Sequence, residues 1–182
     1  VASSLARFLL GNNTSFLIPT IEANTSLNIL ICLIVGILSG FFGVLFSKLI
    51  HFNNDLFSKL KVKPYLKPMI AGFFTGIVGL FLPLVLGSGN SSVDILLQNK
   101  IPIILVTLVF AFKFFVTPFC FGSGAVGGIF LPMLMLGAYL GYICGFISNH
   151  FGFEINLVAI SLIGMASFLS AVARTPITAT VM

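Results

Sequence analysis

Long apolar runs separated by short polar stretches make up most of the chain. A helix of about 20 apolar residues is long enough to cross a hydrocarbon core of about 30 Å. The pattern therefore predicts an all-α membrane protein in which partial-length helices accompany the longer ones. The apolar runs cover residues 27–50, 68–87, 101–121, 133–148 and 157–173, with cut-off helices expected at 1–10 and 177–182.

A polar, basic stretch over residues 51–67 separates the first two runs. We expect a loop here, with Pro64 and Pro68 breaking the helix on either side of Tyr65, because proline lacks the backbone donor of a helix. A positive loop between apolar spans favours the cytoplasmic side. A patch for an anionic ligand is the alternative. The basic residues are Lys48, Lys59, Lys61, Lys63 and Lys67.

Glycine and proline mark further breaks and contacts. Pro83 is expected to kink or end the second span, and a glycine turn at 87–89 leads into a short amphipathic piece that runs to Lys100. Glycines four residues apart share one helix face and let helix backbones approach closely in lipid. We expect such packing at Gly36 and Gly40, at Gly72 and Gly76, and at Gly137, Gly141 and Gly145.

The composition agrees with a lipid environment, since 58% of the residues are hydrophobic and only 7% are charged, against about a quarter charged in soluble domains. The four acidic residues lie in or near loops and form no catalytic pair or metal cluster. We therefore expect no enzyme, no cofactor, no metal site and no nucleic-acid partner. The acids are Glu22, Asp55, Asp94 and Glu154, and the cysteines, expected to be free, are Cys32, Cys120 and Cys144.

Lys113 stands inside the third apolar run. An ionisable residue within a membrane span is a functional candidate by default. Two structural alternatives compete: the lysine lies near a helix end, or it neutralises a cluster of carbonyl groups. We favour a structural role.

The glycine-rich segment from Gly122 to Pro132 is the main candidate site. Irregular backbone in a membrane must be buried in protein or line a cavity. Such a segment leading into a helix presents unpaired N–H groups and the positive end of the helix dipole. Together they form an anion site without a side-chain cation. The alternative, glycines that only allow tight packing, remains open at this point.

The same segment resembles the signature of the CLC family of chloride channels and chloride/proton exchangers. The resemblance rests on the run from Gly124 to Pro132, a GGxFxP-type sequence after a Gly-Ser-Gly turn. Lys113, the turn at 87–89 and the segments 164–166 and 173–178 are also similar to the family. The resemblance covers nearly the whole chain, which we therefore identify as part of a single transmembrane CLC-type domain, residues 1–182, lacking material at both ends.

The resemblance implies a homodimer with one anion pathway in each subunit, built from two inverted halves of tilted and re-entrant helices. The anion would be bound by main-chain N–H groups at Gly128, Ile129 and Phe130, and the Phe130 ring would line the pathway. Gly124, Gly127 and Pro132 would support the motif. Residues 1–10 and 169–182 match the family's subunit interface. The family's gating and proton-transfer glutamates fall outside this chain, and Leu131 replaces the alanine found in many members.

These observations predict a multi-pass protein of the cell membrane that transports chloride or a similar small anion. Passive conduction, with or without voltage gating, and chloride/proton exchange both remain open. A secondary transporter of another anionic substrate is the alternative, because broken helices serve such substrates as well.

Overall fold

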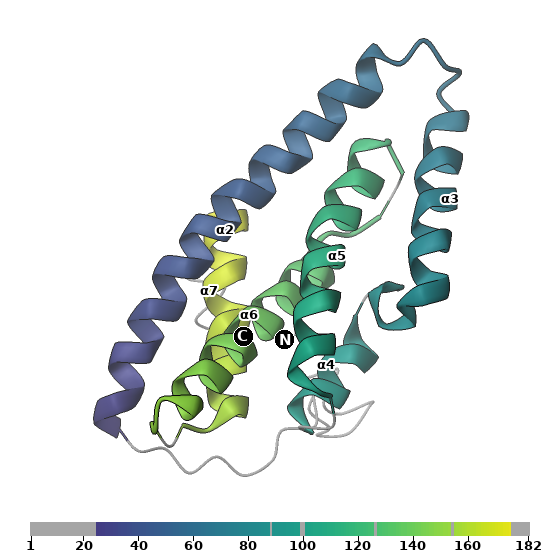
Figure 1. Ribbon diagram of the computed structural model, residues 1–182. Coiled ribbons are helices and arrows are strands. Elements are labelled where there is room, and N and C mark those ends of the chain that lie inside the picture. The colour runs from purple at the N-terminus through teal and green to yellow at the C-terminus, as the bar shows by residue number, and fades with distance from the viewer. Residues whose placement is uncertain (1–24, 88, 99–100, 126, 154, 176–182) are drawn as a thin grey trace, which may run out of the picture.

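The computed structural model describes residues 25–87, 89–98, 101–125, 127–153 and 155–175. Within these ranges every regular element is a helix (Figure 1), which confirms the all-α prediction. Predictions for residues 1–10 and 177–182 lie outside the described residues. The elements are α2 (Thr25–Lys59), α3 (Leu66–Phe81), the short 3-10 helix η1 (Pro83–Val85), α4 (Asn90–Leu97), α5 (Ile103–Gly122), α6 (Phe130–His150) and α7 (Leu157–Ala173).

Helix α2 continues through most of the stretch predicted as a loop, so that prediction is wrong for residues 51–59. The sequence from 44 to 63 contains no glycine or proline that would end a helix. The side-chain amide of Asn53 donates to the Leu49 carbonyl at 2.8 Å, which satisfies this polar group within the helix. The polar residues therefore mark where α2 leaves the hydrocarbon and not where the helix ends.

The prolines act differently from one another. The prediction that Pro68 breaks a helix is wrong. Pro68 lies in the first turn of α3, where a backbone N–H has no helical partner in any case. The expectation for Pro83 is confirmed, because α3 ends at Phe81 and Pro83 opens η1. The second span is therefore shorter than the predicted range 68–87.

Helices α6 and α7 form an antiparallel hairpin with backbones in close contact. A Cβ at Gly137 would lie 2.7 Å from the Met165 Cα, and one at Gly141 would lie 3.0 Å from the Ser161 Cα. Glycine on this face of α6 is thus required for the contact, as predicted. The α6–α7 seam, as we call this contact, also includes Gly164, where a Cβ would meet the Gly137 carbonyl oxygen.

The glycine pairs of α2 and α3 make no such contact within the described residues. An added Cβ at any of the four would find no atom within 4 Å, so the packing predicted for these pairs is not seen among the described residues. Helix α2 instead approaches α7 through Gly43, where a Cβ would lie 2.7 Å from that of Ala171. The four glycines without a near neighbour are Gly36, Gly40, Gly72 and Gly76.

Phenylalanine rings join α2, α5 and α7 in the core. The ring of Phe46 on α2 lies 5.5 Å from that of Phe114 on α5 and 5.8 Å from that of Phe168 on α7. All three side chains are buried. Aromatic contacts at these separations stabilise beyond the area they bury, so this cluster fixes α5, which carries one wall of the site, against α2.

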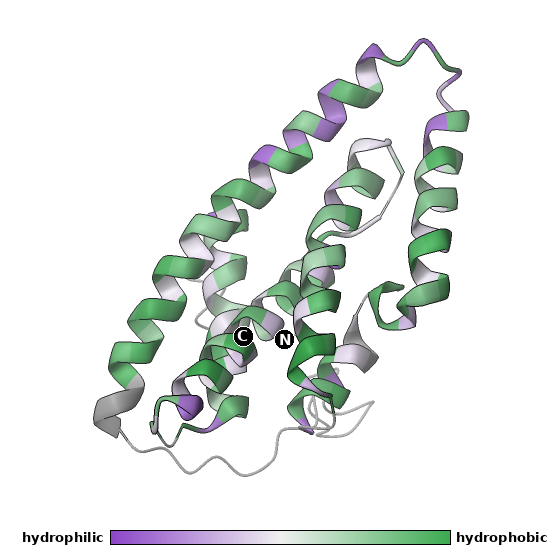
Figure 2. Ribbon diagram, viewed as in Figure 1, coloured by the Kyte–Doolittle hydropathy of each residue, from purple (hydrophilic) through white to green (hydrophobic). Residues whose placement is uncertain are grey.

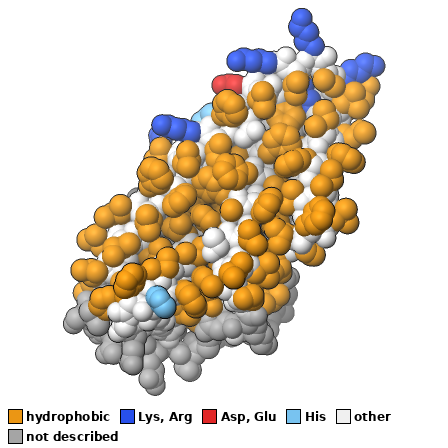
Figure 3. All heavy atoms as spheres, in the orientation of Figure 1, with side chains coloured by type: hydrophobic (Ala, Val, Ile, Leu, Met, Phe, Trp, Pro, Cys, Tyr) orange, Lys and Arg blue, Asp and Glu red, His pale blue; other side chains and the backbone are white. Residues whose placement is uncertain are grey.

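Most residues of the helices are hydrophobic (Figure 2), and large apolar side chains cover the outer face shown in Figure 3. Leu80 and Phe81 are more than four-fifths exposed, at 83% and 81%. An apolar outer surface of this extent indicates lipid as the surrounding solvent. Within the described residues, α2, α5 and α6 are long and apolar enough to cross a membrane, and α3 and α7 are shorter apolar helices.

Candidate functional site: an anion cavity at the start of α6

The glycine-rich segment is a break between two helices, as the sequence predicts. Helix α5 ends at Gly122, and α6 begins at Phe130. Gly122 lets α5 approach α2, because a Cβ there would lie 2.6 Å from the Cβ of Asn53. Gly124 has a φ of 83°, a conformation that favours glycine. These two glycines turn the chain back so that α6 starts beside the last turns of α5.

The first turn of α6 has no side-chain cap. Ile129 occupies the N-cap position and its side chain cannot accept a hydrogen bond. The first backbone bond runs from the Met133 N–H to the Ile129 carbonyl at 3.0 Å. Within the described residues, the N–H groups from Gly127 to Leu131 donate to no protein acceptor, and Pro132 has none. The start of α6 therefore presents donors that have no acceptor among the described residues, at the positive end of a helix dipole.

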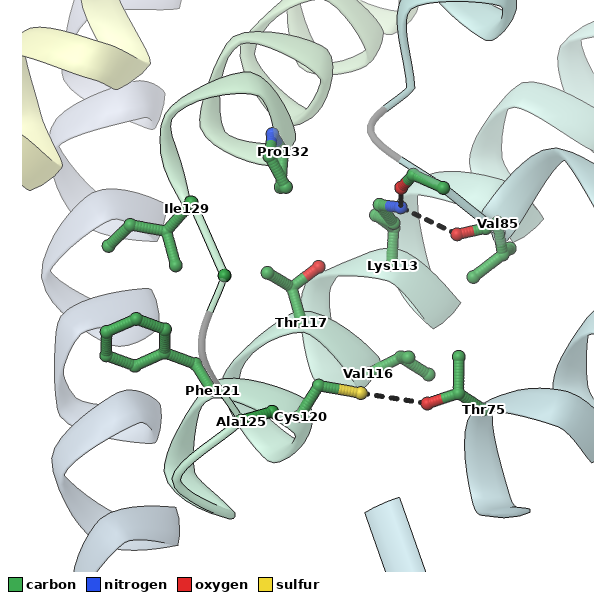
Figure 4. Close-up of a pocket in the computed structure, with 13 residues that line it drawn as sticks. Thr75, Val85, Lys113, Val116, Thr117, Cys120, Phe121, Ala125, Ile129 and Pro132 are labelled. Carbon is green, nitrogen blue, oxygen red and sulfur yellow. Dashed lines mark hydrogen bonds between the residues drawn. The ribbon is translucent and has the colours of Figure 1, made fainter. Parts of the chain in front are cut away.

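Three of these residues, Gly127, Gly128 and Ile129, line a cavity of about 180 Å³ (Figure 4). This space is several times the volume of about 30 Å³ that one water takes up in the liquid, so the cavity has room for a small ion and water. Ile129 and Lys113 lie on opposite sides of it in Figure 4. The other lining residues are Thr75, Val85, Gly87, Val116, Thr117, Cys120, Phe121, Ala125, Gly127, Gly128 and Pro132.

Lys113 lies in the cavity wall opposite α6 (Figure 4). The lysine is buried, and its ammonium donates to the carbonyl oxygens of Val85 at 2.6 Å and Gly87 at 2.7 Å. The prediction that this residue neutralises carbonyl groups is confirmed. An ammonium carries three donors, so one remains beyond these two bonds. Within the described residues no carboxylate pairs with Lys113, which leaves a buried positive charge beside the cavity.

The sequence reasoning missed three polar residues of this wall. Thr117 lines the cavity, and the Cys120 sulfur lies 2.8 Å from the hydroxyl oxygen of Thr75 on α3. Residues 113, 117 and 120 are spaced by four and three, so they share one face of α5. This polar stripe on an otherwise apolar helix was the available signal. Thr75 offers no comparable signal, because its place depends on how α3 packs.

The predicted site residues divide into two groups. Gly127, Gly128, Ile129 and Pro132 line the cavity, together with Lys113. Phe130 provides the first helical N–H, but its ring is not part of the described cavity wall, so its lining role stays a prediction. Gly124 lies outside the wall as well and acts through the turn that it makes.

Comparison with known proteins places these features in a family. The family model described as voltage gated chloride channel matches residues 1–182. The chain is 35% identical over 184 residues to the H(+)/Cl(-) exchange transporter ClcA of Vibrio cholerae serotype O1 (strain M66-2), and the match covers 97% of this chain and 39% of that protein. The chain thus spans about two-fifths of the length of this relative.

Two further relatives carry the same name. The protein of Vibrio campbellii is 29% identical over 184 residues, covering 98% of this chain and 39% of the relative. The protein of Yersinia pestis bv. Antiqua is 35% identical over 158 residues, covering 82% and 33%. With a family match over all 182 residues and apolar helices that can span a bilayer, the chain belongs to the voltage gated chloride channel family of multi-pass membrane proteins.

Proposed function

We propose that the full-length protein transports chloride or a similar small anion, and that the anion binds in the cavity at the start of α6. The observation that carries this proposal is that one cavity is lined both by Gly127, Gly128 and Ile129, whose N–H groups have no acceptor among the described residues, and by Lys113, whose ammonium is buried. Amide groups can bind an anion and release it, which transport requires.

Electrostatics favour an anion over a cation or a neutral solute here. The buried ammonium is costly when its charge is not balanced. The helix dipole adds about half a positive charge at the opposite wall. Both terms are stronger in a low-dielectric site than in water. Within the described residues the cavity wall includes no acidic side chain, so a bound anion would balance the charge.

Chloride/proton exchange is the mode that the relatives support, since their names describe exchange transporters. We propose a transporter without a cofactor or enzymatic activity, acting as a homodimer in a lipid bilayer. Reversal potentials across a pH gradient test the mode on the full-length protein in planar bilayers. A shift with pH supports exchange, and a constant value supports a passive channel, with or without voltage gating.

The main-chain site can be tested by replacing single N–H groups with ester oxygens. α-Hydroxy acids at positions 129 and 130 of the full-length protein would remove one donor each and keep both side chains. We expect halide affinity, measured by calorimetry, to fall about tenfold or more for each ester, because hydrogen bonds to charged groups contribute about 1.5–3 kcal/mol. The matched control is an ester at Val158 in the first turn of α7, which should leave affinity unchanged.

Two outcomes would contradict the proposal. Unchanged halide affinity in both α6 esters would show that these donors do not bind the anion. Chloride that neither moves nor competes in vesicle flux assays, while another anion does, would instead favour a secondary transporter of a different anionic substrate.

A further inference from the structure

The end of the molecule where α2 leads into α3 lies beyond the reach of a bilayer core. A helix of 35 residues is about 52 Å long at 1.5 Å per residue, against a hydrocarbon thickness of about 30 Å. The part from Thr25 to Lys48 alone measures about 35 Å. Even at a tilt of about 40° the helix would rise about 40 Å across the membrane, so the last turns of α2 and the connection to α3 lie at the level of lipid headgroups.

Positive charge is concentrated at this end. Five lysines and one acid, Asp55, fall between residues 48 and 67, so five positive charges against one negative give a formal charge of +4. Figure 3 shows the basic side chains gathered there, above an apolar face. Within the described residues none of the five forms an ion pair. We call this surface the lysine end; it consists of Lys48, Lys59, Lys61, Lys63 and Lys67, of which only Lys67 is half-buried.

Apolar and aromatic side chains stand among these lysines. Tyr65 is 67% exposed, and the Lys63 ammonium lies 5.9 Å from the centre of its ring. Met69, one turn further along, is 68% exposed, and Leu60 is also exposed. Tyrosine is enriched where a membrane meets water, because its ring is apolar and its hydroxyl is polar. This mixture suits the boundary between acyl chains and headgroups better than the surface of a soluble acidic partner.

From these observations we infer that the lysine end is a binding surface for anionic phospholipid headgroups. Basic clusters directly beside a membrane span attract anionic lipids. The exposed lysine side chains are long enough to reach phosphate groups while their methylene chains lie along apolar surface. The lysine end is separate from the α6 cavity, so its binding of lipid does not depend on anion transport.

The test measures lipid selectivity on the full-length protein in mixed vesicles. Spin-labelled phosphatidylglycerol and phosphatidylcholine report, by electron paramagnetic resonance, how much of each lipid is immobilised by the protein. We expect a preference for phosphatidylglycerol that falls about fivefold or more in the triple variant K59Q/K61Q/K63Q, because one lysine near an anionic surface contributes about that factor. The matched control K59R/K61R/K63R keeps the charges and should keep the preference.

Two more measurements distinguish a lipid surface from a phosphate site and from misfolding. Inorganic phosphate at equal ionic strength should not displace the labelled phosphatidylglycerol beyond the effect of salt, because a lipid surface also binds through its apolar side chains. The glutamine variant should elute from size exclusion like the unmodified protein, because all three side chains are exposed. No preference in the unmodified protein, or an equal preference in the glutamine variant, would overturn the inference.

Discussion

Helices α6 and α7 pack against each other along their length, yet they begin in opposite ways. Helix α7 starts after Asn156, whose side-chain oxygen accepts hydrogen bonds from the N–H groups of Val158 at 3.0 Å and Ala159 at 3.3 Å. Helix α6 starts after Ile129, whose side chain has no oxygen to offer. The first turn of α7 is therefore capped by a side chain, whereas that of α6 has no such cap among the described residues.

The two helix starts also differ in their surroundings, since the start of α7 is packed against another helix and the start of α6 lies beside a cavity. Leu157, at the start of α7, packs against α6, and a Cβ added at Gly145 would lie 3.0 Å from its side chain. The start of α6 adjoins a cavity, and a Cβ added at Gly127 or Gly128 would meet nothing within 4 Å. An uncapped helix start in a membrane protein needs another partner for its donors. The difference is consistent with the proposal that the α6 donors bind an anion.

The strongest test of this comparison places a negative charge at the open start. We expect Ile129→Asp to abolish measurable halide binding, a loss of about a thousandfold, because two like charges about 4 Å apart repel by about 4 kcal/mol at an effective dielectric constant of about 20. Calorimetric titration of the full-length protein with chloride measures the effect. Wild-type affinity in this variant would show that the anion binds elsewhere.

The neutral variant Ile129→Asn is the matched control for that charge. Its side-chain oxygen can cap the first turn as Asn156 does in α7, and a cap stabilises by about 1 kcal/mol. Competition of this size should weaken halide binding only about fivefold. A loss as large as that of the aspartate variant would attribute the effect to altered shape and not to charge.

A second test separates the charge of Lys113 from its hydrogen bonds. Lys113→Met leaves the carbonyls of Val85 and Gly87 without their donor, which should destabilise the protein by about 1–3 kcal/mol and also weaken halide binding. Lys113→Gln keeps amide donors without the charge, so we expect near-normal stability and weakened binding. Thermal melting in detergent and chloride titration measure the two properties. Normal chloride affinity in the glutamine variant would show that the charge of Lys113 does not contribute to anion binding.

A third test addresses the α6–α7 seam that the two helix starts share. Gly137→Ala should lower stability by about 1–3 kcal/mol, because the added carbon meets backbone atoms of α7 that cannot move aside without cost. The same change at Gly36 in α2 meets open space and should stabilise slightly, since alanine favours helix. Equal effects of the two changes on the melting temperature would contradict the close contact at the seam.

Sequence reasoning predicted α7 over 157–173 and the break before Pro132, because apolar length and glycine spacing determine both. It was wrong for residues 51–59, where it predicted a loop from polar residues. Polar residues indicate that a segment is in contact with water, whereas continuation of the helix depends on the helix propensity of the residues. The packing that sequence reasoning predicted at Gly36 and Gly40 finds no partner among the described residues. The spacing of glycines indicates which of them share one helix face. It does not indicate whether another helix packs against that face.

The candidate site was predictable only on one side. The donors of residues 127–131 follow from chain-local features, namely a glycine-rich run that enters a helix. The opposite wall requires the Val85 carbonyl to meet Lys113, a contact across 28 residues. Thr75 reaches Cys120 across 45 residues. Such pairings depend on how α3, η1 and α5 pack, which apolar periodicity does not determine.

The smallest expected effect comes from removing the side-chain cap at the start of α7. Asn156→Ala removes the cap from Val158 and Ala159 and should cost about 1 kcal/mol of stability, measured by thermal melting. Because neither Val158 nor Ala159 lines the α6 cavity, chloride titration should reveal no additional binding. A new halide site in this variant would mean that an uncapped helix start is sufficient for halide binding. The cavity and Lys113 would then not be needed to explain an anion site at α6.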